Sequence, residues 1–192
     1  MMENTYAVLI TDAFILHTRG IGEADRIVTA LTRENGVIDI FARSIRNERA
    51  KMRGTVKPYS RVSLSTVIGK RNILKDITTT DTLSAIWREK EKYTAYVNLL
   101  QFVRTQVPAV SAKDKHLFPI IENGTRYLQE SEAKKSPDIL LVAQVSLLSA
   151  LGYVHDKDIE HNTFEKILHD TSISTKRRKD LSQHLRHALL HQ

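Results

Sequence analysis

Apolar and polar residues alternate in short runs over the first eighty residues of the chain, a pattern typical of β-strands. In the clearest run, Val56 to Ile68, the side chains of Val62, Leu64, Thr66 and Ile68 can face one way while those of Arg61, Ser63 and Ser65 face the other. The other β-type runs are Tyr6–Leu16, Asp25–Leu31, Val37–Ala42 and Ile73–Thr79. Five short strands without a long helical pattern predict a small closed or partly open barrel, and the OB-fold is the common five-stranded kind.

Turn residues separate these runs. A glycine-containing loop, Arg19–Glu23, is predicted to end the first strand, and Gly69–Asn72 forms a turn before the last one. Asn35-Gly36 between two β-type runs indicates a hairpin, because both residues tolerate positive φ. The connection after Ala42 is strongly basic.

From Asp81 the apolar residues recur at helical spacing. One helix is predicted from Leu83 to Pro108 and a second over 115–129. A third is predicted from an N-cap at Ser136, with Pro137 at its first position and Gly152 at its end. It is apolar on nearly all sides and should be the buried central helix. Two shorter helices are expected near 161–169 and 176–190.

The change of period near Thr79–Thr82 divides the chain into two predicted domains. Residues 1–80 form an OB-fold nucleic-acid-binding domain and residues 81–192 an α-helical domain, so the predicted fold class is α+β.

Positive charge is concentrated in one segment. The chain has 29 Lys and Arg residues against 22 Asp and Glu, a net charge of +7, but ten of the basic residues and a single acid, Glu48, lie between Arg43 and Lys75. The rest of the chain holds 19 basic and 21 acidic residues, a net charge of −2. A localised basic patch within β-type sequence is the electrostatic signature of nucleic-acid binding, although charge runs in general are more often solvated loops.

The predicted nucleic-acid site follows from this segment. Long basic side chains neutralise phosphates and release counterions, and an aromatic ring offers a stacking platform for a base. Phe14 and Phe41 are assigned to the core, which leaves Tyr59 as the aromatic candidate. The candidate contacts are Arg43, Arg46, Arg49, Lys51, Arg53, Lys57, Tyr59, Lys70 and Arg71. Contacts with the sugar-phosphate backbone of the nucleic acid should dominate, so little sequence specificity is expected.

Other chemistry receives little support. The chain has no Cys, which excludes disulfides, thiolate nucleophiles and Cys-ligated metals. His184, His187 and His191 share a predicted helix face, but no HExxH motif accompanies them, so neither a metal nor a cofactor is expected. No nucleophile-elbow or phosphate-loop motif occurs, and Glu23 and Asp25 are assigned to the framing of a turn rather than to a carboxylate pair. The sequence therefore predicts a protein that is not an enzyme.

No targeting or membrane signal is recognisable. The N-terminus lacks a signal-peptide pattern, and the most apolar window, Ile139–Val154, is interrupted by polar residues and is too short to span a bilayer. The expectation is a cytoplasmic, nucleoid-associated protein without membrane contact.

Several motifs of the chain resemble the RecO family of recombination mediators. They are Gly22–Thr29, Leu31–Gly36, the basic loop with Lys57-Pro58-Tyr59, and Leu147–Tyr153. The resemblance implies an N-terminal OB-fold, a helical C-terminal domain, binding of single- and double-stranded DNA, and strand annealing in recombinational repair. It also implies RecR and the single-strand-binding protein SSB as partners, and through them the loading of RecA.

Three departures from the family pattern bear on this resemblance. Ser44 stands where the basic loop usually has glycine, and Ala50 where it usually has serine. The four-Cys zinc finger that many members carry after the Leu-Gly-Tyr motif is replaced by His155, Asp156 and Asp158. The chain is also shorter than most members after Tyr153. Two other functions stay open at this point, a protein-interaction scaffold that binds an acidic partner and an RNA-binding OB-fold protein. The basic cluster Lys176–Lys179 is either an incidental surface feature or a second DNA contact.

Overall fold

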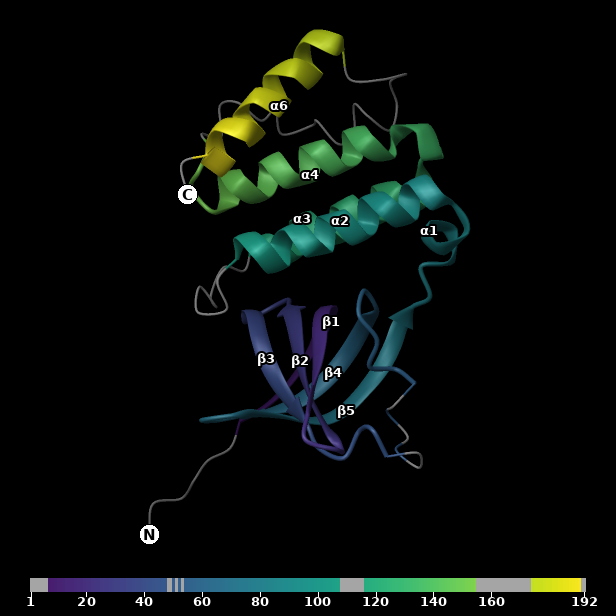
Figure 1. Ribbon diagram of the computed structural model, residues 1–192, viewed down its shortest axis with the longest axis vertical. Coiled ribbons are helices and arrows are strands. Elements are labelled where there is room, and N and C mark those ends of the chain that lie inside the picture. The colour runs from purple at the N-terminus through teal and green to yellow at the C-terminus, as the bar shows by residue number, and fades with distance from the viewer. Residues whose placement is uncertain are drawn as a thin grey trace. The chain divides into compact units, whose positions relative to one another are not determined.

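The structure, a computed structural model, describes residues 7–47, 50, 52, 54–107, 116–154 and 174–190 (Figure 1). It divides into two compact units, each described here by itself. The first contains a barrel up to Thr82 and also takes in the end of helix α2 (Lys90–Gln106) from Arg104. The second contains the rest of α2, up to Val103, and the other helices.

Five strands form a closed barrel in the order β1-β2-β3-β5-β4. Their bounds are β1 Ala7–Ile21, β2 Asp25–Thr32, β3 Gly36–Ala42, β4 Arg61–Ile68 and β5 Asn72–Asp81. The long strand β1 pairs with β4 through its first half and with β2 through its second half, and the register shifts between Ile15 and His17. Such an irregularity bends a strand, which lets one strand serve both sides of a small barrel. The predicted α+β fold, an OB-type barrel followed by helices, is confirmed.

The seams of the barrel differ in extent. All neighbouring strands are antiparallel except β3 and β5, which pair in parallel at two positions, Ile40 with Asn72 and Phe41 with Ile73. The seam between β3 and β5 is therefore the shortest, and it lies at the end of β3.

Alternating side chains fill the barrel. The buried cluster contains Ala13, Ile15, Val28, Ala30, Ile38, Ile40, Ala42, Val62, Leu64, Leu74 and Ile77, and Ile45 and Val56 join it from the connection between β3 and β4. The predicted inward positions of β4 are confirmed for Val62, Leu64 and Thr66, which are buried between half-buried neighbours. Because core positions recur at every second residue of β3, Asp39 and Phe41 project to the outer side of the barrel.

Three local expectations for the strands need correction. β1 continues through Arg19 and Gly20, and the turn begins at Gly22, whose φ is +55°. β4 begins at Arg61, not Val56, because the preceding residues form a turn with Tyr59 at φ +66°. The hairpin between β2 and β3 is confirmed, but its loop is Arg33–Asn35, and only Gly36 of the Asn-Gly pair has positive φ.

The helices after the barrel are α1 (Ser84–Arg88), α2, α3 (Leu117–Glu130), the 3₁₀ turn η1 (Ala133–Lys135), α4 (Ser136–Ala150) and α6 (Thr175–Leu190). The single helix expected from Leu83 to Pro108 is two helices, because Glu89 adopts an extended conformation, φ −119° and ψ 118°. The helix expected near 161–169 lies outside the described residues. None of the described helices combines the length and the apolar content that a membrane span needs.

Helix α4 packs against α3 and α6 (Figure 1). Gly124 allows the close approach of α3, since a Cβ there would lie 3.1 Å from Leu99 of α2 and 3.5 Å from Ala143 of α4. Ser136 is not the N-cap of α4 as predicted, because η1 precedes the helix and Lys135 takes the cap position. The predicted end is confirmed: Gly152 has φ +83°, and the N–H groups of Gly152 and Tyr153 donate to the carbonyls of Ser149 and Leu148.

Candidate nucleic-acid interface

The outer face of β1, β2 and β3 carries two rows of side chains that follow from the strand register. In the first row Arg19 pairs with Ile27, and Ile27 pairs with Phe41. In the second row the members are His17, Thr29 and Asp39. Directly paired side chains on one face lie about 5 Å apart at Cβ, so each row is a set of touching neighbours. This face and the turns β1–β2 and β4–β5 form the surface with which OB-folds bind oligonucleotides.

The turn between β4 and β5 brings two predicted residues to this face. Lys70 and Arg71 are exposed, and the guanidinium carbon of Arg71 lies 4.9 Å from the centre of the Phe41 ring. A guanidinium at that distance is attracted by the ring face. The ring of Phe41 is 8% exposed, but it lies outside the barrel core and beneath Arg71.

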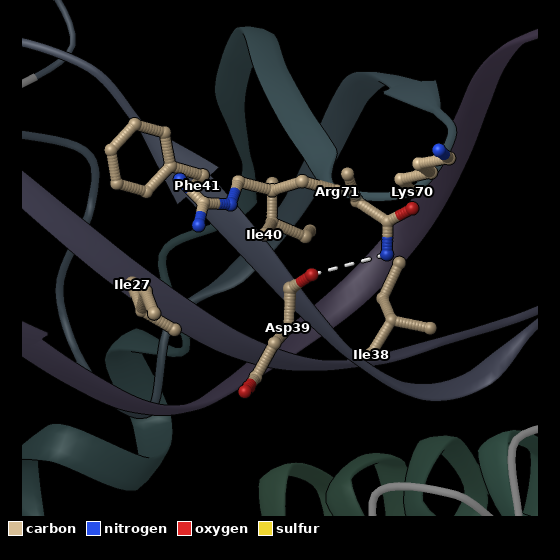
Figure 2. A pocket seen from close by; sticks show the side chains of 8 residues that line it. Ile27, Ile38, Asp39, Ile40, Phe41, Lys70 and Arg71 are labelled. Carbon is tan, nitrogen blue, oxygen red and sulfur yellow. Dashed lines mark hydrogen bonds between the residues drawn. The ribbon is translucent and has the colours of Figure 1, made fainter.

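A pocket of about 380 Å³ opens between these residues. Ile27, Ile38, Asp39, Ile40, Phe41, Lys70, Arg71 and Asn72 line it. Figure 2 shows the guanidinium of Arg71 beside the ring of Phe41, and the side chain of Asp39 below them, directed away from Arg71. The amide Nδ2 of Asn72 donates to the backbone carbonyl of Asp39 at 3.1 Å and so ties the turn to β3.

The start of the basic connection packs against the β1–β2 turn. The backbone N–H of Ser44 donates to Oδ1 of Asp25 at 2.7 Å, and that of Arg46 to the carbonyl of Ala24 at 2.9 Å. The guanidinium of Arg46 donates to the carbonyl of Gly22 at 2.9 Å. The carboxylate of Asp25 therefore holds this loop, as expected of charges that frame a turn. Ser44 has φ +52°, the left-handed region in which glycine is favoured.

Five exposed basic residues thus surround one face of the barrel. Arg43 follows Phe41 by two residues. The guanidinium of Arg46 lies beside Gly20, the residue after Arg19, since a Cβ on Gly20 would be 3.3 Å from it. We call this set the basic rim. Its members are Arg19, Arg43, Arg46, Lys70 and Arg71, all exposed.

The remaining predicted residues lie elsewhere or outside the described residues. Lys57 and Tyr59 precede β4, whereas Lys70 and Arg71 follow it, and eight strand residues span about 25 Å. The N–H of Tyr59 donates to the carbonyl of Ile15 at 2.8 Å, at the bend of β1. Arg49, Lys51 and Arg53 lie outside the described residues.

One residue of this face escaped the sequence reasoning, because Arg19 was assigned to a loop outside the basic segment. Phe41 was assigned to the core and is buried as expected, but the alternation of β3 places it on the outer side of the barrel, beneath Arg71. Arg19 could be found only through the register that pairs β1 with β2.

The second row of the face is polar. Oγ1 of Thr29 donates to Oδ1 of Asp39 at 2.6 Å. Burial lowers the pKa of His17 from its ordinary value, and the positive charges of Arg104 and Arg19 act in the same direction, against the opposing charge of Asp39. A histidine with a lowered pKa is neutral at pH 7, so His17 adds no positive charge to the face there.

The basic cluster Lys176–Lys179 begins α6 in the helical unit. Arg178 donates to Oδ2 of Asp138 in the first turn of α4 at 2.8 Å, and the side chain of Asp138 is only 5% exposed. The hydrogen bond and the charge of Asp138 raise the pKa of Arg178. An arginine near a helix N-terminus opposes the helix dipole unless an anion accompanies it, and Asp138 is that anion.

Metal ligands do not gather in the described residues. Within those residues no three His, Asp or Glu side chains form a set that could hold a metal ion. His191, His155, Asp156 and Asp158 lie outside them.

Comparison with known proteins agrees with the barrel and its motifs. Residues 6–86 match the family model described as recombination protein O N terminal. A DNA repair protein RecO of Thermodesulfovibrio yellowstonii is 32% identical over 151 residues, 76% of this chain and 58% of that protein. Proteins of the same name from Thermobifida fusca and Myxococcus xanthus are 29% and 27% identical, each over 73% of this chain and 57% of its own length. The chain thus spans less than two thirds of the length of these curated relatives, and the residues that match the family model include the OB-type barrel that carries the basic rim. The chain belongs to the RecO family.

Proposed function

We propose that this protein is a non-enzymatic DNA-binding protein of recombinational repair, which binds single- and double-stranded DNA and promotes the annealing of complementary strands. One observation carries the proposal: Arg71 lies over Phe41 in the middle of the basic rim, on the face that OB-folds use for oligonucleotides. Cations for phosphates and a planar group for bases are the two elements of single-strand binding. The name DNA repair protein RecO, which the relatives carry, supports the same function.

Annealing follows from charge neutralisation. Two complementary strands repel each other through their phosphates, so a protein that neutralises both backbones and leaves the base edges accessible speeds their pairing. The exposed side chains of the rim contact phosphates in this proposal, and Arg49, Lys51, Arg53 and Lys57 extend the same charge along the connection. Residues 1–80 are proposed as the DNA-binding domain, and the helical residues 81–192 as a domain for protein partners.

The proposed partners are RecR and the single-strand-binding protein SSB, and through them RecA. Their support is the family resemblance. The two alternatives, a scaffold that binds an acidic protein segment and an RNA-binding OB-fold protein, use the same basic rim and differ only in its ligand.

A salt titration of binding distinguishes these functions. Fluorescence anisotropy measures the affinity of the full chain for single-stranded DNA, single-stranded RNA of the same sequence and an acidic peptide at increasing salt. If about five phosphates are neutralised, the slope of log K against log salt for single-stranded DNA should be roughly −3 to −4. A flat response to salt, or tighter binding of RNA or of the peptide than of DNA, contradicts the proposal.

A matched pair of charge reversals locates the site. Lys70→Glu at the rim should weaken DNA binding about tenfold, because it replaces a phosphate contact by a repulsion. Lys57→Glu makes the same change of charge at the other end of β4 and should have a several-fold smaller effect. Equal losses in the two variants would show that the rim is not the centre of the site.

A further inference from the structure

The pocket beside Phe41 contains a carboxylate in the middle of a basic surface, and this combination is unfavourable for phosphate binding alone. Asp39 is exposed and lines the pocket together with Lys70 and Arg71. A negative charge there repels a phosphate backbone, so backbone neutralisation does not account for it. We propose that the pocket binds one unpaired base that carries an exocyclic amino group, and that the carboxylate of Asp39 accepts a hydrogen bond from that group.

The pocket has the dimensions and walls for a planar ligand. Its volume of about 380 Å³ lies within the range of small-molecule sites, roughly 300–1,000 Å³. One side is formed by the guanidinium of Arg71 on the Phe41 ring, and the neighbouring side chain of Ile27 is apolar (Figure 2). Unpaired bases stack on arginine guanidinium planes, and at this wall the guanidinium of Arg71 is exposed above the buried Phe41 ring.

The chemistry of Asp39 determines which base fits. An ionised carboxylate only accepts hydrogen bonds. Oδ1 is oriented by Oγ1 of Thr29 at 2.6 Å, and the bond from Asn72 fixes the backbone of Asp39. Asp39 lies two residues before Phe41 on the same outer face of β3, so the edge of a base stacked beside Arg71 can reach its carboxylate. The exocyclic amino groups of cytosine and adenine can donate to Asp39 from the position at which thymine and uracil carry O4, an acceptor that the carboxylate repels.

This inference rests on the proposed function and adds a base preference to it. The test compares oligodeoxycytidine with oligodeoxyuridine of equal length at pH 7 and constant salt, since the two differ only on one edge of the ring: cytosine has an amino group at C4 and an acceptor N3, whereas uracil has a carbonyl at C4 and an N3–H. The full chain should bind oligodeoxycytidine about five- to tenfold more tightly, the discrimination expected of one base-edge contact.

The variant Asp39→Asn separates a contact with the base from a structural role. Asparagine has the same shape and keeps an acceptor for Thr29, but it can also donate to O4 of uracil. The preference should fall below twofold, while the affinity for oligodeoxyuridine rises because a repulsive charge has been removed. If Asp39 has only a structural role, both oligonucleotides change affinity by the same factor and the preference persists, which overturns the inference.

Asp76→Asn is the matched control. Asp76 is an exposed acid on β5, and its Oδ1 accepts a hydrogen bond from the N–H of Ile77. This variant should leave the preference unchanged. Equal affinities of the unmodified protein for the two oligonucleotides overturn the base preference and leave the proposed DNA binding intact, whereas failure to bind either one overturns both.

Discussion

The basic segment 43–75, which supplies all of the barrel's basic rim except Arg19, and the basic first turn of α6 look alike as sequence and differ in what surrounds them. Each is a group of lysines and arginines close together, and either could be taken for a DNA contact. On α6, Arg178 is paired with the nearly buried carboxylate of Asp138. On the rim, the contacts of Arg46 and Arg71 are a backbone carbonyl and a phenylalanine ring, neither of which carries a charge.

This difference shows that a run of basic residues has two uses that its sequence does not separate. A cation that is paired with a buried carboxylate stabilises the protein, and its positive charge is neutralised locally. A cation held by neutral groups keeps its charge available for a ligand. Arg178 therefore joins α4 to α6, while the rim is the better candidate for phosphates.

Charge reversal of the rim tests the comparison with the largest expected effect. The triple variant Arg43→Glu, Lys70→Glu and Arg71→Glu should weaken binding of single-stranded DNA by about 100-fold or more, because three phosphate contacts become repulsions. Arg46 is left unchanged because it holds the β1–β2 turn. Anisotropy at low salt measures the loss, and circular dichroism checks that the fold is retained. Wild-type affinity in a folded triple variant would mean that DNA binds elsewhere.

The ion pair between Arg178 of α6 and Asp138 of α4 should contribute to stability rather than to DNA binding. Asp138→Asn removes the carboxylate that Arg178 contacts at 2.8 Å, and should lower the free energy of unfolding of the helical unit by about 1–3 kcal/mol, since Arg178 is half exposed and can be solvated. Urea unfolding followed by far-UV circular dichroism measures the change, and DNA affinity should stay the same.

A surface pair provides the control for Asp138→Asn. Glu132 and Lys134 lie 2.7 Å apart, but each side chain is 68% exposed. Glu132→Gln should leave the midpoint of urea unfolding unchanged, because an exposed ion pair is screened by solvent. A loss as large as that of Asp138→Asn would show that burial does not distinguish the two pairs.

The backbone between Arg43 and Arg46 of the rim also differs from that of the regular helix α6. Ser44 adopts φ +52°, and its backbone N–H donates a hydrogen bond to the carboxylate of Asp25. A glycine at this position would keep that hydrogen bond. Ser44→Gly should therefore stabilise the barrel by about 0.5–1 kcal/mol, because it removes the cost of a left-handed conformation at a residue with a Cβ. Ser63→Gly, on the extended strand β4, should destabilise it by a similar amount. The midpoint of urea unfolding measures both, and equal signs for the two variants would contradict the backbone explanation.

The smallest effect is expected for the remaining cations of α6. Replacing Lys176, Arg177 and Lys179 by Gln while keeping Arg178 should change the affinity for single-stranded DNA by less than about twofold, because the rim carries most of the binding. Strand annealing, followed by quenching of labelled complementary oligonucleotides, is the informative readout. Unchanged annealing assigns the cluster to stability, whereas slower annealing at unchanged affinity identifies it as a second DNA contact.

The sequence predicted the barrel well because strand periodicity and turn residues are local signals. The alternation of β4 identified Val62 and Leu64 as inward positions, and Gly36 marked the hairpin correctly. The break at Glu89 could not be predicted, because glutamate is a good helix former and the surrounding residues continue the helical pattern. The start of α4 was misplaced since Ser136 has the features of an N-cap, while the 3₁₀ turn before it supplies the actual entry.

The site was only partly accessible from sequence for a different reason. The charge of residues 43–75 indicated a region, but its members are divided between two ends of β4. Which of them meet depends on strand register, which brings Arg19, Ile27 and Phe41 into one row. Charge counting along the chain has no access to such cross-strand neighbours.

The short parallel seam between β3 and β5 has a consequence for the motions of the barrel. Strand pairs open locally at a free energy that depends on how many interactions are broken together, and this seam offers two paired positions, at Ile40 and Phe41. The amides of Asn72 and Ile73 should therefore exchange with solvent faster than those in the middle of β2. Because Phe41, Asn72 and Arg71 also line the pocket, a bound nucleotide would bridge the two strands and slow this exchange. The barrel is thus expected to open most readily where it binds its ligand, and ligand binding would close it.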